Sequence, residues 1–277
     1  MPLRARRHIR RMRGGAQSHL VEADDSRYYV VKFVNNPQHR RILVNELLGS
    51  CILQYLQIST PETAIISVDR DFLLDNPQVS FELGTKRVPV EVGWHFGSRY
   101  PADPSTIAVY DFFPDVLLEK IINLSDFLGV LVVDKWMANA DARQSIYFRA
   151  QVRNPFSPRQ QERRQTGFIA QMIDQGYLFN GPFWNFPDAP LHGLALRRKV
   201  YETVTSLNDF QPWLDQVLNI PPEVLDDARK RIPSQWLDQD SGALDSLLEK
   251  LFERRSLTPD LILSCRRTKP DLFPNWL

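Results

Sequence analysis

Apolar residues in the first part of the chain come in short alternating runs that are separated by turn residues. One longer pattern places apolar residues at helical spacing between Pro37 and Pro61, and this pattern predicts a single long helix. The alternating runs predict strands, the first two joined as a hairpin, and the last one ends in a hinge at Pro114. These expected strands lie at residues 18–22, 27–33, 63–68, 87–91 and 107–114.

Beyond Pro114 the spacing of apolar residues becomes mostly helical. Two short strands, 145–149 and 168–173, flank the polar stretch 152–165, which is expected to be an exposed hairpin insertion. The chain therefore predicts an α+β fold, with a β-rich part at 14–113 and a mostly helical part at 114–277. The expected helices of the second part lie at residues 127–137, 195–206, 210–218, 222–231 and 242–255.

Composition and charge narrow the class of protein. The 277 residues are 43% hydrophobic and 24% charged with a net charge of +1, as in an ordinary globular protein. Six basic residues and no acid fall within residues 1–13, which predicts a disordered basic tail, with contact to nucleic acid or docking on the rest of the protein as the alternatives. Two cysteines without paired spacing argue against a disulfide framework or a zinc site. No apolar run reaches the length of a membrane span, so a cytoplasmic protein without membrane association is expected.

A carboxylate follows the apolar strand at 168–173. Asp174 ends this run and is followed by Gln175 and Gly176. A carboxylate at a strand end beside glycine is a good ligand for a divalent cation, because the chain can turn away and leave the oxygens accessible. Asp174 is therefore the predicted principal ligand of a magnesium ion.

Three features before Asp174 are typical of an ATP site. The loop Gly14-Gly15-Ala16-Gln17-Ser18 consists mostly of small residues, so its backbone N–H groups could reach phosphate oxygens. Lys32 lies in the second strand of the hairpin and would grip the inner phosphates. Glu46 lies 14 positions later among apolar helix positions, where a charge is costly unless it is paired. Glu46 is thus predicted to form the ion pair that orients Lys32.

The remaining candidates lie around the hinge and the end of the first helix beyond it. Asp141 would accept or orient the proton of an attacking hydroxyl, and Gln144 would offer its amide carbonyl to magnesium. Tyr110, in the strand before the hinge, is assigned to the nucleotide site. Taken singly, each of these residues is an ordinary turn, strand or helix residue. In this order they form the set of a phosphoryl-transfer enzyme of protein-kinase type, with ATP and Mg²⁺ as cofactors.

Several short motifs resemble those of the HipA-like kinases, from about Arg13 to Arg255. The motifs that carry the resemblance are Gly15-Ala16-Gln17, Val31-Lys32, Asn45-Glu46, Asn139-Ala140-Asp141 and Ile173-Asp174. The resemblance implies a two-lobed protein-kinase-like fold, ATP with magnesium, and transfer to a Ser or Thr hydroxyl of a protein. It also implies Ser18 as a site of autophosphorylation.

Two departures from the motifs of these kinases leave functions other than kinase activity possible. Arg143 and Gln144 follow Asp141 where HipA kinases have a His and, farther on, an Asn metal ligand, and Gln175-Gly176 replaces the Phe-Gly of common protein kinases. Intact Lys32, Glu46, Asp141 and Asp174 favour an active kinase. Gln144 favours a pseudokinase that works through a partner protein, and a small-molecule phosphotransferase is the third hypothesis.

Overall fold

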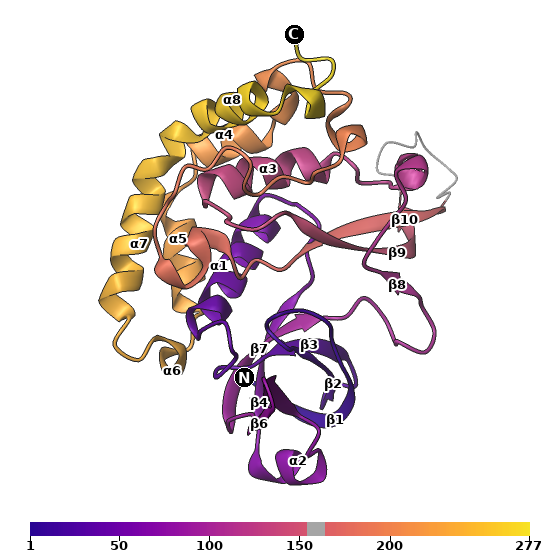
Figure 1. The fold of residues 1–277 in the computed structure, drawn as a ribbon, viewed down its shortest axis with the longest axis vertical. Coiled ribbons are helices and arrows are strands. Elements are labelled where there is room, and N and C mark those ends of the chain that lie inside the picture. Colours follow the sequence, from indigo (N-terminus) through magenta and orange to yellow (C-terminus); the bar gives the residue numbers. More distant parts are fainter. Residues whose placement is uncertain (154–163) are drawn as a thin grey trace.

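A closed five-stranded barrel forms one end of the molecule (Figure 1). The computed structural model describes residues 1–153 and 164–277. The barrel has the strand order β1-β2-β3-β7-β4, and its interior is an apolar cluster of its own. A two-stranded sheet of β5 and β6 and the short helix α2 accompany it. The elements are β1 (Leu3–Arg11), β2 (His19–Ala23), β3 (Tyr28–Lys32), β4 (Thr63–Val68), α2 (Arg70–Asp75), β5 (Ser80–Leu83), β6 (Lys86–Pro89) and β7 (Gly93–Arg99).

The basic segment at the start of the chain is not a disordered tail, so that prediction was wrong. It forms strand β1, which pairs antiparallel with β2 and parallel with β4. Acidic side chains of other elements form ion pairs with its arginines: Arg4 lies 2.6 Å from Asp69, and Arg7 lies 2.7 Å from Glu22. These partners are distant in sequence, which is why the local charge run was misleading.

Helix α1 (Arg41–Tyr55) lies between the barrel and the helical part of the molecule (Figure 1). Most of its residues are buried, because elements of both parts pack around it. Gly49 permits one close approach: a Cβ atom there would lie 2.4 Å from a methyl group of Leu178. The sequence predicted this helix correctly, and its burial on all sides explains why its apolar pattern is not confined to one face.

The second part of the chain combines helices with a three-stranded sheet of order β10-β9-β8. The helix expected at 195–206 is instead a 3₁₀ turn at Arg198–Tyr201, and the strand expected at 107–114 shortens to two residues. The expected insertion at 152–165 falls largely outside the described residues. The elements are β8 (Val109–Tyr110), α3 (Asp126–Trp136), β9 (Gln144–Arg153), β10 (Arg164–Ile173), α4 (Trp213–Leu218), α5 (Pro222–Lys230), α6 (Ser234–Leu237), α7 (Ser241–Arg254) and α8 (Thr258–Thr268).

The mixed content agrees with the predicted α+β class. Strand β7 was not predicted, because glycines and polar residues interrupt its apolar pattern. Within the two described ranges, no helix has both the length and the apolar character needed to cross a membrane.

Strand β7 contains a buried histidine with a hydrogen-bond partner at each ring nitrogen. The Nδ1 atom of His95 accepts a hydrogen bond from the Val34 backbone N–H at 3.0 Å, and Nε2 lies 3.1 Å from the Glu91 carbonyl oxygen. The ring is therefore neutral, with its proton on Nε2. Burial lowers the pKa of His95 from 6.5 to about 4.

We expect the free energy of unfolding to decrease as the pH falls from 6.5 to about 4. In this range His95 binds a proton in the unfolded chain but stays neutral in the folded protein. At about 1.4 kcal/mol per pKa unit, this single residue contributes about 3 kcal/mol across that window. Urea unfolding at several pH values would measure the slope. The variant His95→Gln should show a shallower dependence, and an identical slope in both proteins would contradict the prediction.

Candidate active site

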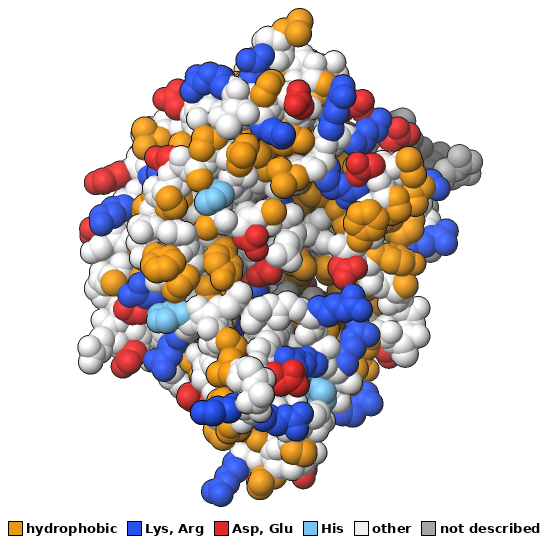
Figure 2. Space-filling model, in the orientation of Figure 1, with side chains coloured by type: hydrophobic (Ala, Val, Ile, Leu, Met, Phe, Trp, Pro, Cys, Tyr) orange, Lys and Arg blue, Asp and Glu red, His pale blue; other side chains and the backbone are white. Residues whose placement is uncertain are grey.

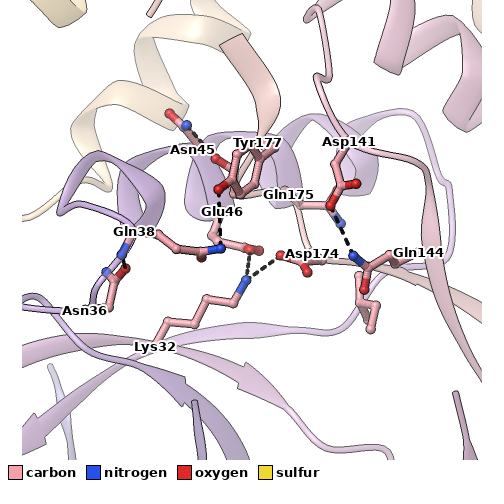
Figure 3. A network of polar contacts seen from close by, with 12 residues as sticks. Lys32, Asn36, Gln38, Asn45, Glu46, Asp141, Gln144, Asp174, Gln175 and Tyr177 are labelled. Carbon is pink, nitrogen blue, oxygen red and sulfur yellow. Dashed lines mark hydrogen bonds and ion pairs between the residues drawn. The ribbon is translucent and has the colours of Figure 1, made fainter. Parts of the chain in front are cut away.

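Lys32 lies at the centre of a buried ion-pair cluster (Figure 3). Its Nζ atom is 2.6 Å from Oδ1 of Asp174 and also contacts Oε1 of Glu46. The side chains of Lys32 and Glu46 are only 11% and 4% exposed, whereas that of Asp174 is 33% exposed. Strand β3, helix α1 and the end of β10 thus bring together three residues that the sequence separates by up to 142 positions.

The lysine of this cluster is charged, because two carboxylates lie beside it. Burial by itself would lower the pKa of Lys32, but the Asp174 and Glu46 carboxylates outweigh it and raise that pKa above its usual value. The positive charge of Lys32 in turn lowers the pKa of Asp174. Lys32 is therefore a permanent cation and Asp174 a permanent anion at neutral pH.

The small-residue loop connects β1 and β2 and borders the same cavity as this cluster. Gly14 has φ of +116°, a conformation that other residues rarely adopt. Gln17 binds away from the loop: its Oε1 accepts from the Glu82 backbone N–H at 2.8 Å, and its Nε2 donates to the Glu82 carbonyl at 2.9 Å. Gln17 thereby fastens the loop to strand β5, and its side chain is not available to a nucleotide.

A cavity of about 660 Å³ lies between the loop, the barrel and the Asp174 segment. This volume suits a small-molecule ligand. Four arginines line it in addition to Lys32, and basic side chains are prominent over the barrel on the face shown in Figure 2. The predicted site residues that line the cavity are Gly14, Gly15, Ala16, Ser18, Lys32, Glu46, Gln144 and Asp174, and the arginines are Arg10, Arg11, Arg13 and Arg99.

Asp141 adjoins this cavity through Gln144. The Gln144 amide donates from Nε2 to Oδ2 of Asp141 at 3.2 Å, and Oδ1 of Asp141 accepts from the Ala142 N–H at 2.8 Å (Figure 3). The backbone of Asp141 is held on both sides, since its N–H donates to Oδ1 of Asn139 and its carbonyl accepts from the Gly193 N–H. The carboxylate is partly exposed and therefore able to meet an acceptor molecule.

The backbone after Asp174 is fastened to helix α1 by a buried asparagine. Nδ2 of Asn45 donates to the carbonyl oxygens of Gly176, Leu178 and Gly181 at 2.8–3.0 Å. Asp174 itself has φ of +60°, and a Cβ atom on Gly176 would lie 2.6 Å from Ile42. Helix α1 therefore orients Lys32 through Glu46, and it holds the segment after Asp174 through Asn45.

The donor atoms fit a magnesium ion shared with a nucleotide. Asp174 offers a partly exposed carboxylate, and Gln144 directs its N–H at Asp141, which leaves the amide carbonyl as the ligand atom. In the described parts of the chain, no group of three or more His, Cys, Asp or Glu could hold a metal by itself. Magnesium commonly uses one or two carboxylates together with phosphate oxygens and water, so these few ligands are sufficient.

Tyr110 is not part of the cavity wall, contrary to its assignment. Its side chain is 47% exposed and lies edge-on to Phe168, while its neighbours Val109 and Asp111 line the cavity. Successive side chains of a strand point to opposite faces, so the structure gives no support for a nucleotide contact of Tyr110.

Sequence reasoning missed three contributors to the site. Asn45 and Arg143 are fully or nearly fully buried polar residues that hold the two functional loops, and Gln38 lines the cavity and donates to the Tyr177 hydroxyl at 3.4 Å. The available signal was position, because Asn45 precedes Glu46 and Arg143 lies two residues after Asp141. Nothing in the local pattern revealed their distant partners.

Comparison with known proteins agrees with this geometry. A family model described as HipA-like kinase matches residues 6–256. The chain belongs to the HipA-like kinase family. As a member of this family it is a kinase-like phosphotransferase.

Solved structures and curated proteins add little to the family assignment. The crystal structure of the Golgi casein kinase with Mn/ADP bound has 11% sequence identity and a TM-score of 0.46, and the match covers 97% of this chain and 73% of that chain. A second crystal structure of the Golgi casein kinase has 12% identity and a TM-score of 0.48, over 97% of this chain and 72% of that chain. No curated protein matches the sequence significantly.

Proposed function

We propose that this HipA-like family member is an ATP-dependent kinase that transfers the γ-phosphoryl group to a Ser or Thr hydroxyl of a protein. The observation that carries the proposal is the Lys32 cluster: a charged lysine held between Glu46 and Asp174 on the wall of a cavity that is covered by a glycine loop. Phosphoryl transfer depends mainly on positioning and charge stabilisation, and this arrangement supplies both.

Each residue has a defined task in the proposed reaction. Lys32 binds inner phosphate oxygens, and Glu46 holds its ammonium group in place. Asp174 and Gln144 would hold Mg²⁺, which neutralises charge on the phosphates when it is bound. Asp141 orients the acceptor hydroxyl and takes its proton as the oxygen bonds to phosphorus and ADP leaves.

The decisive experiment is transfer of label from γ-labelled ATP in the presence of Mg²⁺. Purified protein is incubated alone and with candidate protein acceptors, beside the variants Asp141→Ala and Asp174→Ala. Label incorporated by the wild type and by neither variant supports a kinase. Nucleotide binding without any transfer would instead support the pseudokinase hypothesis, which is favoured by Gln144 in place of the asparagine of other HipA kinases.

We also expect Mg-ATP to stabilise the fold. At a ligand concentration of about 100 times the dissociation constant, binding adds about 2.7 kcal/mol to the free energy of unfolding. For a chain of this size, that corresponds to a rise in melting temperature of roughly 5–10 °C. Thermal unfolding across millimolar Mg-ATP measures it, and an unchanged melting temperature in folded protein would contradict nucleotide binding.

Autophosphorylation of Ser18 stays a prediction. Ser18 is 5% exposed and is among the residues that line the cavity, which places this residue beside the space assigned to the phosphates. A phosphate there would bring about −1.5 to −2 charges next to the triphosphate and would oppose rebinding of ATP. Mass spectrometry after incubation with ATP locates the modified residue.

A further inference from the structure

We infer that Arg143 and Gln175 are positioning residues that hold the Asp174 metal-binding loop in register with the Asp141 loop; this inference rests on the proposed function. The contact between them joins Nη1 of Arg143 to Oε1 of Gln175 at 2.5 Å. Neither residue was assigned a role by its sequence pattern, and in the described structure they connect the two loops that carry the chemistry.

Arg143 is anchored firmly on the helical side. Its side chain is 0% exposed, its Nε donates to Oδ2 of Asp134 at 2.8 Å, and its Nη2 contacts the other oxygen of that carboxylate. Asp134 also accepts from Asn139 Nδ2 at 3.0 Å, and Oδ1 of Asn139 accepts from the Asp141 N–H at 3.1 Å. The same buried carboxylate thus positions Arg143 and, through Asn139, the backbone of Asp141.

The opposite end of Arg143 grips the chain on both sides of Asp174. Nη1 donates to the Ile173 carbonyl at 3.0 Å as well as to Gln175. Gln175 is 1% exposed, and its Nε2 donates to the Met172 carbonyl at 3.0 Å. One nitrogen atom therefore fixes the residues that precede and follow the metal ligand.

This arrangement gives a physical reason for glutamine after Asp174. A phenylalanine at that position can pack against neighbours, but it cannot accept a hydrogen bond from a buried guanidinium. Removing the acceptor would leave a buried charged N–H group without one of its partners, so the loop would shift to satisfy it. Outer contacts of this kind set the orientation of a metal ligand, and their loss typically weakens metal binding by about 10–100-fold.

The test measures how strongly nucleotide binding depends on metal. Isothermal titration calorimetry gives the dissociation constant of ADP in the presence of Mn²⁺ and in the presence of EDTA. The ratio of the two values is the gain in ADP affinity that the metal provides. For Gln175→Met, which has similar length and no acceptor, we expect this gain to fall about tenfold. Gln171→Met is the matched control, because Gln171 lies on strand β10, four residues before Gln175, and its buried Oε1 has no hydrogen-bond partner in the described structure.

A second variant separates positioning from general packing. Gln175→Glu keeps an oxygen that can accept from Arg143 but loses the donor to Met172, so we expect it to retain most of the metal gain. The inference is overturned by an unchanged gain in Gln175→Met, by an equal loss in Gln171→Met, or by an equal loss in Gln175→Glu. A wild-type protein that binds no nucleotide would overturn the proposed function itself, and this inference with it.

Discussion

Replacing Asp141 by asparagine should reduce phosphoryl transfer by about 10²–10⁴-fold while the affinity for Mg-ATP stays nearly unchanged. The carboxylate of Asp141 is partly exposed beside Gln144, and among the described residues it forms no ion pair with Lys32, so under the proposed function its charge acts on the acceptor hydroxyl rather than on the nucleotide. Transfer of label from γ-labelled ATP and calorimetric titration of nucleotide measure the two quantities separately.

The companion variant Asp174→Asn distinguishes the two carboxylates. Asp174 contacts Lys32 directly and is the expected magnesium ligand, so its loss should weaken nucleotide binding as well as transfer. If both variants lost binding to the same degree, the roles assigned to Asp141 and Asp174 would be wrong.

Replacing Lys32 by methionine should abolish nucleotide binding and also destabilise the fold. Glu46 is 4% exposed and would lose the cation that compensates its charge. Breaking a buried ion pair from one side commonly costs about 3–5 kcal/mol, because an uncompensated charge remains in the interior. Chemical denaturation of the variant and of the wild type measures the difference.

The double variant Lys32→Met/Glu46→Gln separates stability from function. It removes the buried charge along with its partner, so most of the lost stability should return, whereas nucleotide binding should stay absent. Recovery of binding in the double variant would show that Lys32 does not contact the phosphates. A single variant as stable as the wild type would show that Glu46 is neutral or solvated.

The sequence alone was sufficient for features that depend on neighbouring residues. Strand β4 was predicted with its observed bounds at Thr63–Val68, and helix α1 was predicted to within a few residues, because periodicity is a local property. The Lys32–Glu46 pair was predicted because a charge among apolar helix positions requires a partner, and the preceding strand offers one.

Tertiary structure decided the features that depend on distant partners. The arginine-rich start of the chain forms strand β1 by pairing with β2 and β4, and Glu22, Asp69 and Glu82 form ion pairs with three of its arginines; no local pattern contains that information. Asn45 and Arg143 show the same limit, since each donates to acceptors in the segment after β10, which meets them only after the chain has folded. A buried polar side chain is stable only when its partners surround it, and these partners are fixed by the packing of the whole molecule.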